Sequence, residues 1–337
     1  MKHLKSVLKY LIPLLLAIVL ITIIINKVDV PKLIQRVSSA DIKWVSLAIF
    51  ISILSHLSRA YRWNILLQPL GYYPTIKTTF AAVMVGYFGN IFLPRGGEVM
   101  RCLVLTKVNK IPFNASFGTV VAERAFDFIC LLILIGFSLI LEFDRFSTFF
   151  YNILLKKKGI ETTNYTLLLV LTGIIFLIIL FVFYIYRSKV YNSTIFKKTQ
   201  QFLLGIWKGI ISVKNSDRKG AFLLHTVFIW LAYFLMTYIM FFALPATEKL
   251  GLIAGLVILI VGGLGMSAPV SGGIGPSHIM VAGALHLFYQ ISQEEGIAYA
   301  FVIHTSQLIS IIIIGGLSSI WVLIFQRKNK IEHHVEG

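Results

Sequence analysis

Charged side chains inside strongly apolar segments are the residues of this sequence best suited to bind a ligand. The first group lies in the sequence PRGGEVMR, where Glu98 and Arg101 are three residues apart and would share a helix face. Arg95 stands three residues before Glu98, at an interruption of the apolar pattern. These residues predict either an anion site or an internal ion pair of Glu98 with Arg101 or Arg95.

Two glycines, Gly96 and Gly97, separate Arg95 from Glu98. Glycine tolerates a positive φ and a close approach of the backbone, so this pair predicts a tight turn. A helix that starts just after Gly97 would direct its N-terminal N–H groups at the turn, which favours a bound anion.

A second charged group is the sequence ERAFD in the middle of an apolar segment. Glu123 and Asp127 are four residues apart and share a helix face, and Arg124 lies beside them. Charges at membrane depth are costly unless they are paired or hydrated, so they should face the protein interior or a cavity. The two readings are a ligand site and a salt-bridge network with Arg59 or Arg101 that locks helices together.

Two arginines occupy a further apolar segment, together with Ser55 and His56 one turn away. Arg59 lies deep in the segment, and a guanidinium matches phosphate geometry in a bidentate way. Arg62 lies nearer the end, where its side chain is expected to reach the membrane surface. We therefore predict that Arg59 contacts a phosphate.

The sequence SGGIGPSH at 271–278 is a second glycine-rich interruption. Gly272 and Gly273 predict a backbone cradle for an anion. His278 and His304 are expected to be buried and hydrogen-bonded, with a proton relay as the alternative. The site residues predicted overall are Arg59, Arg95, Gly96, Gly97, Glu98, Arg101, Glu123, Arg124, Asp127, Gly272, Gly273 and His278.

Composition places these residues in a membrane protein. Hydrophobic residues make up 57% of the 337 residues and charged ones 13%, against about 25% charged in soluble domains. The formal charge of +17 arises mostly in short loops, which indicates topology signals and headgroup contacts rather than nucleic-acid binding. Neither the two cysteines nor any catalytic motif predicts a metal site, a cofactor or a soluble enzyme.

The elements that must position the charged residues are helices, because lipid offers no partner for free backbone groups. The pattern predicts an all-α polytopic membrane protein with about six full spans and two opposed re-entrant hairpins. The spans are expected at 8–26, 44–67, 113–141, 165–186, 220–243 and 297–325, and the hairpins at 76–110 and 250–291.

The distribution of basic residues predicts how the chain is oriented. The N-terminus, the loop 187–219 and the C-terminal tail are rich in Lys and Arg, so all three should be cytoplasmic. The hairpins then enter the membrane from opposite sides. The basic run 156–158 is the poorest fit, because it falls outside. We expect a bacterial cytoplasmic membrane protein with both termini inside.

An internal repeat appears when the chain is shifted by about 176 residues. The sequence VGYFGNIFLPRGGEV at 85–99 aligns with VGGLGMSAPVSGGIG at 261–275, and their directions are opposed. This is typical of an inverted-topology repeat, although two glycine-rich segments can also match by chance. The predicted division is a first repeat at 1–141, a loop and span at 142–186, the basic loop 187–219, the rest of the second repeat at 220–325 and a tail at 326–337.

Three motifs in this order resemble a known family. They are N-x-x-L-P-R-G-G-E-x-x-R at 90–101, E-R-x-x-D at 123–127 and P-x-S-G-G-I-G-P at 269–276. They resemble the membrane domain of the lysylphosphatidylglycerol synthase/flippase family, which includes UPF0104 members. The resemblance implies re-entrant segments and flipping of aminoacylated phosphatidylglycerol, and links other relatives to lipid-linked sugar metabolism.

Two departures from the family pattern limit what is carried over. The soluble aminoacyl-transferase domain of the full-length synthases is absent from this sequence, so we do not expect it to make the aminoacyl lipid. A Glu usually follows the second glycine motif of the family, where His278 stands here. The role of that acid is therefore not carried over.

The favoured function is a flippase or transporter of an anionic phospholipid or lipid-linked substrate. Arg59, Arg95 and Arg101 would bind phosphate, and the carboxylates would balance them. The alternatives are an intramembrane lipid-modifying enzyme and a membrane scaffold for a partner enzyme. The expected partners are the membrane, the lipid, and either a second copy of the chain or a lipid-synthesis enzyme, with no nucleic acid.

Overall fold

The structure is a computed structural model that describes residues 30–145, 147, 217–268 and 270–335. All regular elements within this part are helical. The spans predicted at 8–26 and 165–186, and nearly all of the predicted loop 187–219, lie outside the described residues.

Four helices are long and apolar enough to cross a membrane. They are α3 (Ile42–Leu67, continued by the 3-10 turn η1, Gln68–Leu70), α6 (Phe113–Leu141), α10 (Lys219–Met240, continued by η4, Phe241–Ala243) and α13 (Gln293–Val335). They coincide with four of the predicted spans. The chain is therefore a multi-pass, helical membrane protein.

Shorter helices form the two segments that were predicted to be broken. The first contains α4 (Ile76–Phe92) and α5 (Gly97–Asn109), and the second contains α11 (Leu252–Met266), the turn η5 (Ser271–Gly273) and α12 (Pro276–Tyr289). A further short helix, α2 (Val30–Ser38), precedes α3. The two helices of each broken segment pack against each other, as a hairpin requires.

The first break uses its glycines for a close approach of the backbone and not for a positive φ, the two properties expected of them from the sequence. The positive φ falls on Arg95, at 61°, whereas Gly96 has a φ of −75°. Gly97 begins α5, and a Cβ there would collide with the carbonyl oxygen of Gly86 on α4. The glycine is thus needed for the close approach of two helices, and the turn itself is made by an arginine in a left-handed conformation.

The second break places three of its glycines in the left-handed conformation. Gly272, Gly273 and Gly275 all have a positive φ, between 61° and 99°. Pro276 then opens α12, where its missing N–H costs nothing. This break is longer and more irregular than the first one.

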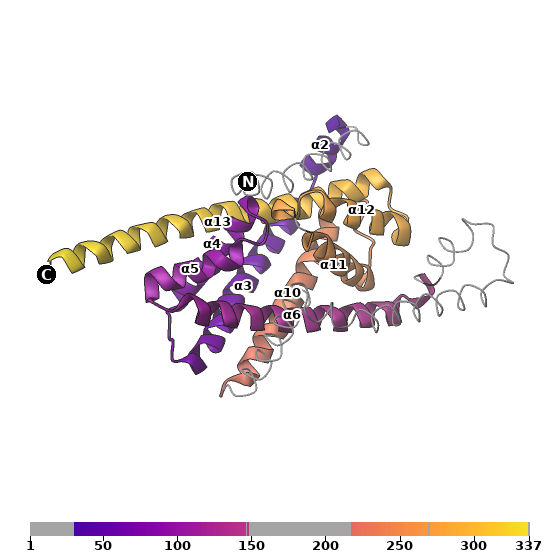
Figure 1. Ribbon diagram of the computed structural model, residues 1–337. Coiled ribbons are helices and arrows are strands. Elements are labelled where there is room, and N and C mark those ends of the chain that lie inside the picture. Colours follow the sequence, from indigo (N-terminus) through magenta and orange to yellow (C-terminus); the bar gives the residue numbers. More distant parts are fainter. Residues whose placement is uncertain (1–29, 146, 148–216, 269, 336–337) are drawn as a thin grey trace, which may run out of the picture.

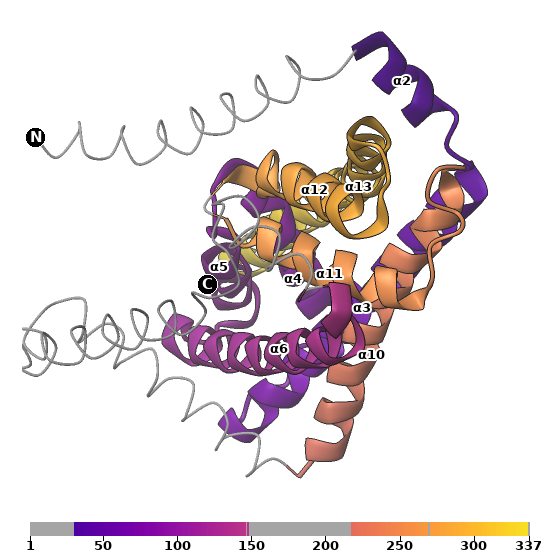
Figure 2. The same cartoon turned by 90° about the vertical axis from the view of Figure 1, so that its right-hand side faces the viewer.

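The long helices frame the short ones. Figure 1 shows α6 and α13 running in opposite directions, and the quarter-turn view in Figure 2 places α4, α5 and α11 between them. Helices α3 and α10 are antiparallel and pack along their length. Their ends are joined by the amide of Asp41, which donates to the carbonyl of Ala243 at 2.9 Å.

The helix contacts follow one scheme twice. Helix α4 packs on α3, α5 and α13, while α11 packs on α10, α12 and α6. Helix α5 packs on α6 in the first set, and α12 packs on α13 in the second. Exchanging α3, α4, α5 and α6 for α10, α11, α12 and α13 therefore reproduces the main contacts.

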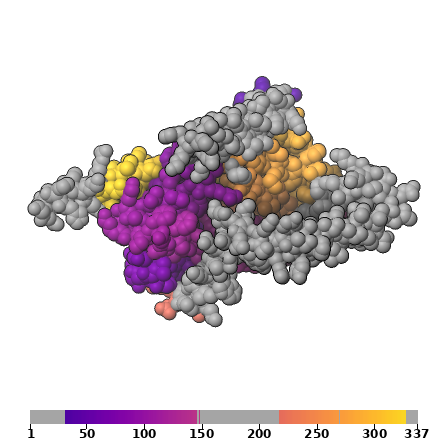
Figure 3. Space-filling view, viewed as in Figure 1, coloured from indigo at the N-terminus to yellow at the C-terminus, as the bar shows by residue number. Residues whose placement is uncertain are grey.

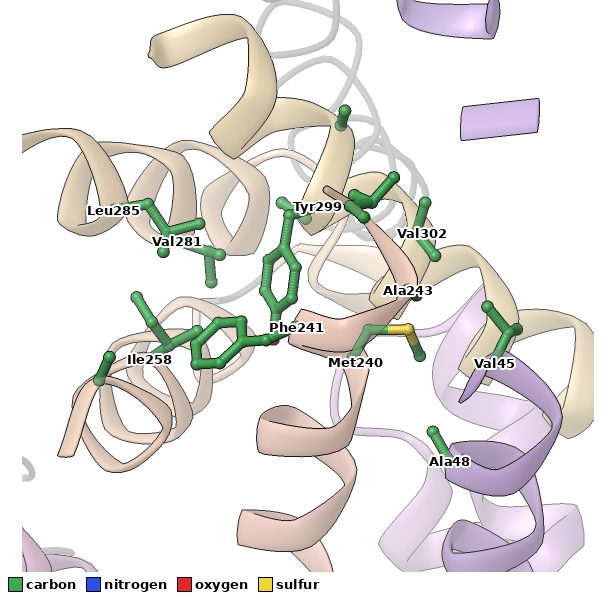
Figure 4. Close-up of a cluster of buried hydrophobic side chains, with 14 of the residues drawn as sticks. Val45, Ala48, Met240, Phe241, Ala243, Ile258, Val281, Leu285, Tyr299 and Val302 are labelled. Carbon is green, nitrogen blue, oxygen red and sulfur yellow. The ribbon is translucent and has the colours of Figure 1, made fainter. Parts of the chain in front are cut away.

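Two buried apolar clusters hold these helices together. One joins the start of α3 to α10–α13, with Phe241 and Tyr299 at its centre (Figure 4). The other surrounds Trp63, Leu67 and Leu105 in the first set of helices. On the face seen in Figure 3, the purple and magenta helices of the first set lie beside the orange helices of the second. Much of α6 exposes large apolar side chains, as a lipid-facing helix does.

Candidate functional site

A buried carboxylate on α6 is the centre of a cluster of charges. Oε1 of Glu123 lies 3.0 Å from Nη1 of Arg59 and 2.8 Å from Nη2 of Arg62. Its Oε2 lies 2.6 Å from Nη2 of Arg101. One carboxylate therefore pairs with three guanidinium groups, and it brings α3, α5 and α6 together.

A second carboxylate, Asp127, shares two of these arginines. Its Oδ1 lies 2.8 Å from Nη2 of Arg62, and its Oδ2 lies 3.2 Å from Nη1 of Arg59. Arg124 approaches the same Oδ2 at 3.5 Å. The four-residue spacing of the two acids on α6 places both on the face that meets α3.

Uncharged groups from neighbouring helices complete the cluster. Tyr233 of α10 accepts a hydrogen bond from Nη2 of Arg59 at 2.9 Å, and Thr226 accepts one from Nη1 of Arg62 at 3.2 Å. The guanidinium of Arg101 stacks 4.5 Å from the ring of Trp63, a cation–π contact. The second set of helices thus contributes hydroxyl groups to a site whose charges come from the first set.

The centre of the cluster is inaccessible to solvent. The side chains of Arg62 and Glu123 are 0% exposed and that of Arg59 is 2% exposed. Burial of charge is costly unless the groups are paired, and loss of one partner typically costs about 3–5 kcal/mol. The Nε atoms of Arg59, Arg62 and Arg101 still lack a hydrogen-bond partner. The inner pairs therefore hold helices together while retaining unused hydrogen-bonding capacity.

The rim of the cluster opens into a small pocket. Arg124 and Glu98 face each other there at 3.6 Å, with side chains 40% and 28% exposed. One carboxylate oxygen of Glu98, Oε2, has no hydrogen-bond partner. The pocket lies between α4, α5 and α6 and is lined by Val83, Gly86, Tyr87, Asn90, Gly97, Glu98, Arg101 and Arg124.

Six of the predicted charged residues meet in this region: Arg59, Glu98, Arg101, Glu123, Arg124 and Asp127. Gly97 lines the pocket as well. The alternative of an ion pair of Glu98 with Arg101 or Arg95 is wrong, because Glu98 faces Arg124 and Arg101 turns to Glu123. Arg101 pairs with Oε2 of Glu123, the oxygen left free because Arg59 and Arg62 both contact Oε1.

Arg95 lies outside the cluster. Its Nη2 donates to the carbonyl of Ser267 at 2.8 Å, and this exposed contact joins the first break to the second. Gly96 packs against the side chain of Leu93 in the same turn. Arg95 therefore links the two breaks, and neither Arg95 nor Gly96 lines the pocket.

The predicted residues of the second half form a separate group at the second break. His304 donates from Nε2 to the carbonyl of Gly272 at 2.9 Å. Nδ1 of His278 accepts from the amide of Gly275 at 3.3 Å, and the two imidazole rings lie 4.7 Å apart. The histidines are hydrogen-bonded, as expected. Gly273 is held against Met266.

The sequence reasoning missed Arg62 as a member of the cluster. We expected its side chain to reach the membrane surface, but it is fully buried between two carboxylates. Its position three residues after Arg59 gave the signal, since the two share a helix face. Tyr233 and Thr226 had no such signal, because they belong to a helix more than 160 residues away in sequence.

No group of three or more His, Cys, Asp or Glu side chains suited to a metal ion occurs within the described residues. The charged side chains of the cluster pair with each other instead. Chemically, the cluster offers guanidinium N–H groups at the pocket, since Arg101 and Arg124 line it.

Comparison with known proteins gives the family. A family model for the lysylphosphatidylglycerol synthase TM region matches residues 10–315. The chain belongs to this family. The match spans all three motifs and every residue of the cluster, and no solved structure matches the chain.

Three curated relatives match over different lengths. A UPF0104 membrane protein of Pyrococcus horikoshii is 25% identical over 341 aligned positions, which cover 93% of each chain. A UPF0104 membrane protein of Methanocaldococcus jannaschii is 32% identical over 122 residues, 35% of this chain and 36% of the relative. The glycosyltransferase AglD of Haloferax volcanii is 27% identical over 128 residues, 38% of this chain and 20% of the relative.

Proposed function

We propose that this membrane protein carries an anionic phospholipid, or a lipid-linked substrate with an anionic headgroup, from one leaflet to the other. The observation that supports this proposal is the charge balance of the cluster beside the pocket. Four guanidinium groups (Arg59, Arg62, Arg101 and Arg124) face three carboxylates (Glu98, Glu123 and Asp127), which leaves one excess positive charge.

The excess charge lies in the inner part of the cluster, where three arginines share the two carboxylates of Glu123 and Asp127. At the rim, Arg124 has contacts of 3.6 Å to Glu98 and 3.5 Å to Asp127, so it is the most loosely held of the four arginines. A phosphate in the pocket would pair with Arg124 and with the outer side of Arg101. Arg59 would then support Glu123 and Asp127 instead of touching the lipid, which revises the role first expected for it.

Transport needs access from both sides, and the packing scheme suggests how the chain provides it. We propose an inverted repeat in which α3–α6 and α10–α13 are equivalent, with the divisions near 141 and 220 predicted from the sequence. Under this proposal each pair of short helices is a re-entrant hairpin, and the two hairpins enter from opposite sides. The matched helix contacts support the equivalence. Both termini would face the cytoplasm.

A direct test is transbilayer movement in proteoliposomes. Purified protein is reconstituted in phosphatidylcholine vesicles with a trace of fluorescent phosphatidylglycerol or fluorescent phosphatidylcholine, and the outer label is quenched chemically. The proposal predicts faster exposure of the inner phosphatidylglycerol than in protein-free vesicles, with little change for phosphatidylcholine. Equal rates with and without protein for the anionic lipid would contradict it.

An intramembrane enzyme is the second candidate, and the partial match to the glycosyltransferase AglD favours it. The matched part amounts to 20% of that relative. An enzyme would form a new lipid product without leaflet exchange. Thin-layer chromatography of vesicle lipids after incubation with a lipid-linked sugar donor separates the two functions.

A further inference from the structure

A second polar group lies behind the pocket, between α3 and α13. Ser52 donates from its hydroxyl to Oε1 of Gln307 at 2.6 Å, and its Oγ lies 3.3 Å from Nε2 of His56. Ser52 is 1% exposed and His56 is 6% exposed. Ser52, His56 and Gln307, which we call the polar triad, carry no formal charge when the imidazole is neutral.

The directions of these hydrogen bonds fix which atoms remain free. Because the single hydroxyl proton of Ser52 goes to Gln307, its oxygen accepts from Nε2–H of His56. In the neutral ring, Nδ1 of His56 is then an acceptor. This Nδ1 and the amide Nε2 of Gln307 are both buried without a hydrogen-bond partner. The triad therefore has one free acceptor and one free donor group.

Unmet hydrogen bonds of buried groups destabilise a fold and are rare in native proteins. A leucine or methionine in place of Gln307 would fill similar space without this penalty. Two such atoms in one small group therefore point to a ligand that pairs with them. A ligand that both donates and accepts, as a hydroxyl group does, fits this pair of atoms.

The triad adjoins the charged pocket through one aromatic ring. Tyr87 of α4 lines the pocket, and its ring lies 4.5 Å from the imidazole of His56. On the other side, Gln307 lies one helical turn beyond His304, which is bonded to the second break at Gly272. The triad thus lies between the charged site of the first half and the glycine-rich break of the second.

We propose that Ser52, His56 and Gln307 form an uncharged subsite that binds hydroxyl groups of the lipid headgroup while its phosphate is at the arginine rim. The ring of Tyr87 separates the two subsites and must turn aside for the headgroup to reach the triad. This inference rests on the proposed function, since it names the headgroup chemistry that the same site selects: a phosphodiester that carries free hydroxyls, as in a glycerol or sugar headgroup.

The test compares two anionic lipids, one with and one without free hydroxyls in the headgroup. Short-chain phosphatidylglycerol has two free hydroxyls, and phosphatidylmethanol has none. Binding to detergent-purified protein is measured by titration calorimetry for wild type, Gln307→Met and Ser52→Ala. The matched control is Ser55→Ala, which removes a buried hydroxyl of the same helix that bonds only to the carbonyl of Ser52 at 2.8 Å.

We expect wild type to prefer phosphatidylglycerol by about 5-fold to 10-fold in Kd, the size of one or two net hydrogen bonds. Gln307→Met and Ser52→Ala should lose this preference while their affinity for phosphatidylmethanol is unchanged, and Ser55→Ala should keep it.

Three results would overturn the subsite. The first is an equal affinity of wild type for the two lipids, which would mean that water alone fills the triad. The second is an unchanged lipid preference in both triad variants. The third is a loss of the preference in Ser55→Ala as well. Failure of the proposed transport is a different outcome. Phosphatidylglycerol would then bind with the predicted preference but would not cross the bilayer in proteoliposomes.

Discussion

The two breaks of the chain occupy equivalent places but carry different chemistry. The first, between α4 and α5, lies beside three carboxylates and four arginines and turns on an arginine with a φ of 61°. The second, between α11 and α12, turns on three glycines and has two histidines beside it. The contact scheme is thus shared, while the buried charges of the described residues lie in one half. A repeated fold can keep its helix packing in both halves and still hold its buried charged side chains in one half.

The largest effect should follow from removal of the central carboxylate. Glu123→Gln leaves three guanidinium groups with too little negative charge, and we expect a loss of about 3–5 kcal/mol of unfolding free energy. Chemical unfolding in detergent micelles measures it. Glu248→Gln, an exposed acid in the second half, should change stability by less than about 0.5 kcal/mol. Similar losses in the two variants would remove the distinction between the halves.

Close helix approach is the feature that the two breaks share, so both should be sensitive to a single methyl group. A Cβ at Gly97 would meet the backbone of α4, and one at Gly265 would meet the backbone of Ser277 on α12. We expect Gly97→Ala and Gly265→Ala to lose about 1–3 kcal/mol each.

The matched control for these variants is Gly263→Ala, where the added methyl meets no atom within 4 Å. This variant should gain about 0.5–1 kcal/mol from helix propensity. Thermal unfolding of the three proteins in the same detergent gives the comparison. A loss at Gly97 with none at Gly265 would show that only the first pair is tightly packed.

The turn residues of the first break allow the smallest and most specific prediction. Arg95 has a left-handed conformation that glycine adopts without strain. Arg95→Gly should therefore be more stable than Arg95→Ala by about 1 kcal/mol, although both lose the bond to Ser267. Equal midpoints of thermal unfolding would contradict the assigned backbone conformation and make the two breaks more alike.

Much of this comparison could be predicted from the sequence, because it depends on the spacing of residues along the chain. Four spans, the location of both breaks and the shared helix face of Glu123 and Asp127 follow from apolar periodicity and glycine position. The sequence did not predict which oppositely charged side chain each charged residue contacts. Whether Glu98 meets Arg101 or Arg124 depends on how α5 rotates against α6. The depth of Arg62 depends on Glu123 and Asp127, which lie on α6, more than 60 residues later in the sequence.

The free hydrogen-bonding atoms of the polar triad also could not be predicted from the sequence. His56 was visible as a polar residue near Arg59, but nothing in its surroundings indicated Gln307, which lies about 250 residues later. Contacts between distant segments decide which buried polar groups are satisfied, so only the folded chain shows the unmet ones.

The measurement that tests the account most directly is the charge preference of lipid movement in the Arg124→Gln variant. Arg124 is the most exposed arginine of the cluster, and its contacts of 3.5 and 3.6 Å are loose, so its loss should cost about 1 kcal/mol of stability or less. The matched control is Arg145→Gln, which removes an exposed arginine paired with Glu142 just beyond the C-terminal end of α6.

The ratio of phosphatidylglycerol to phosphatidylcholine movement is measured in proteoliposomes. We predict a ratio well above one for wild type and Arg145→Gln, and a fall of about tenfold for Arg124→Gln, as loss of one charged contact implies. An unchanged ratio in Arg124→Gln would contradict the claim that the rim of this cluster binds the anionic headgroup.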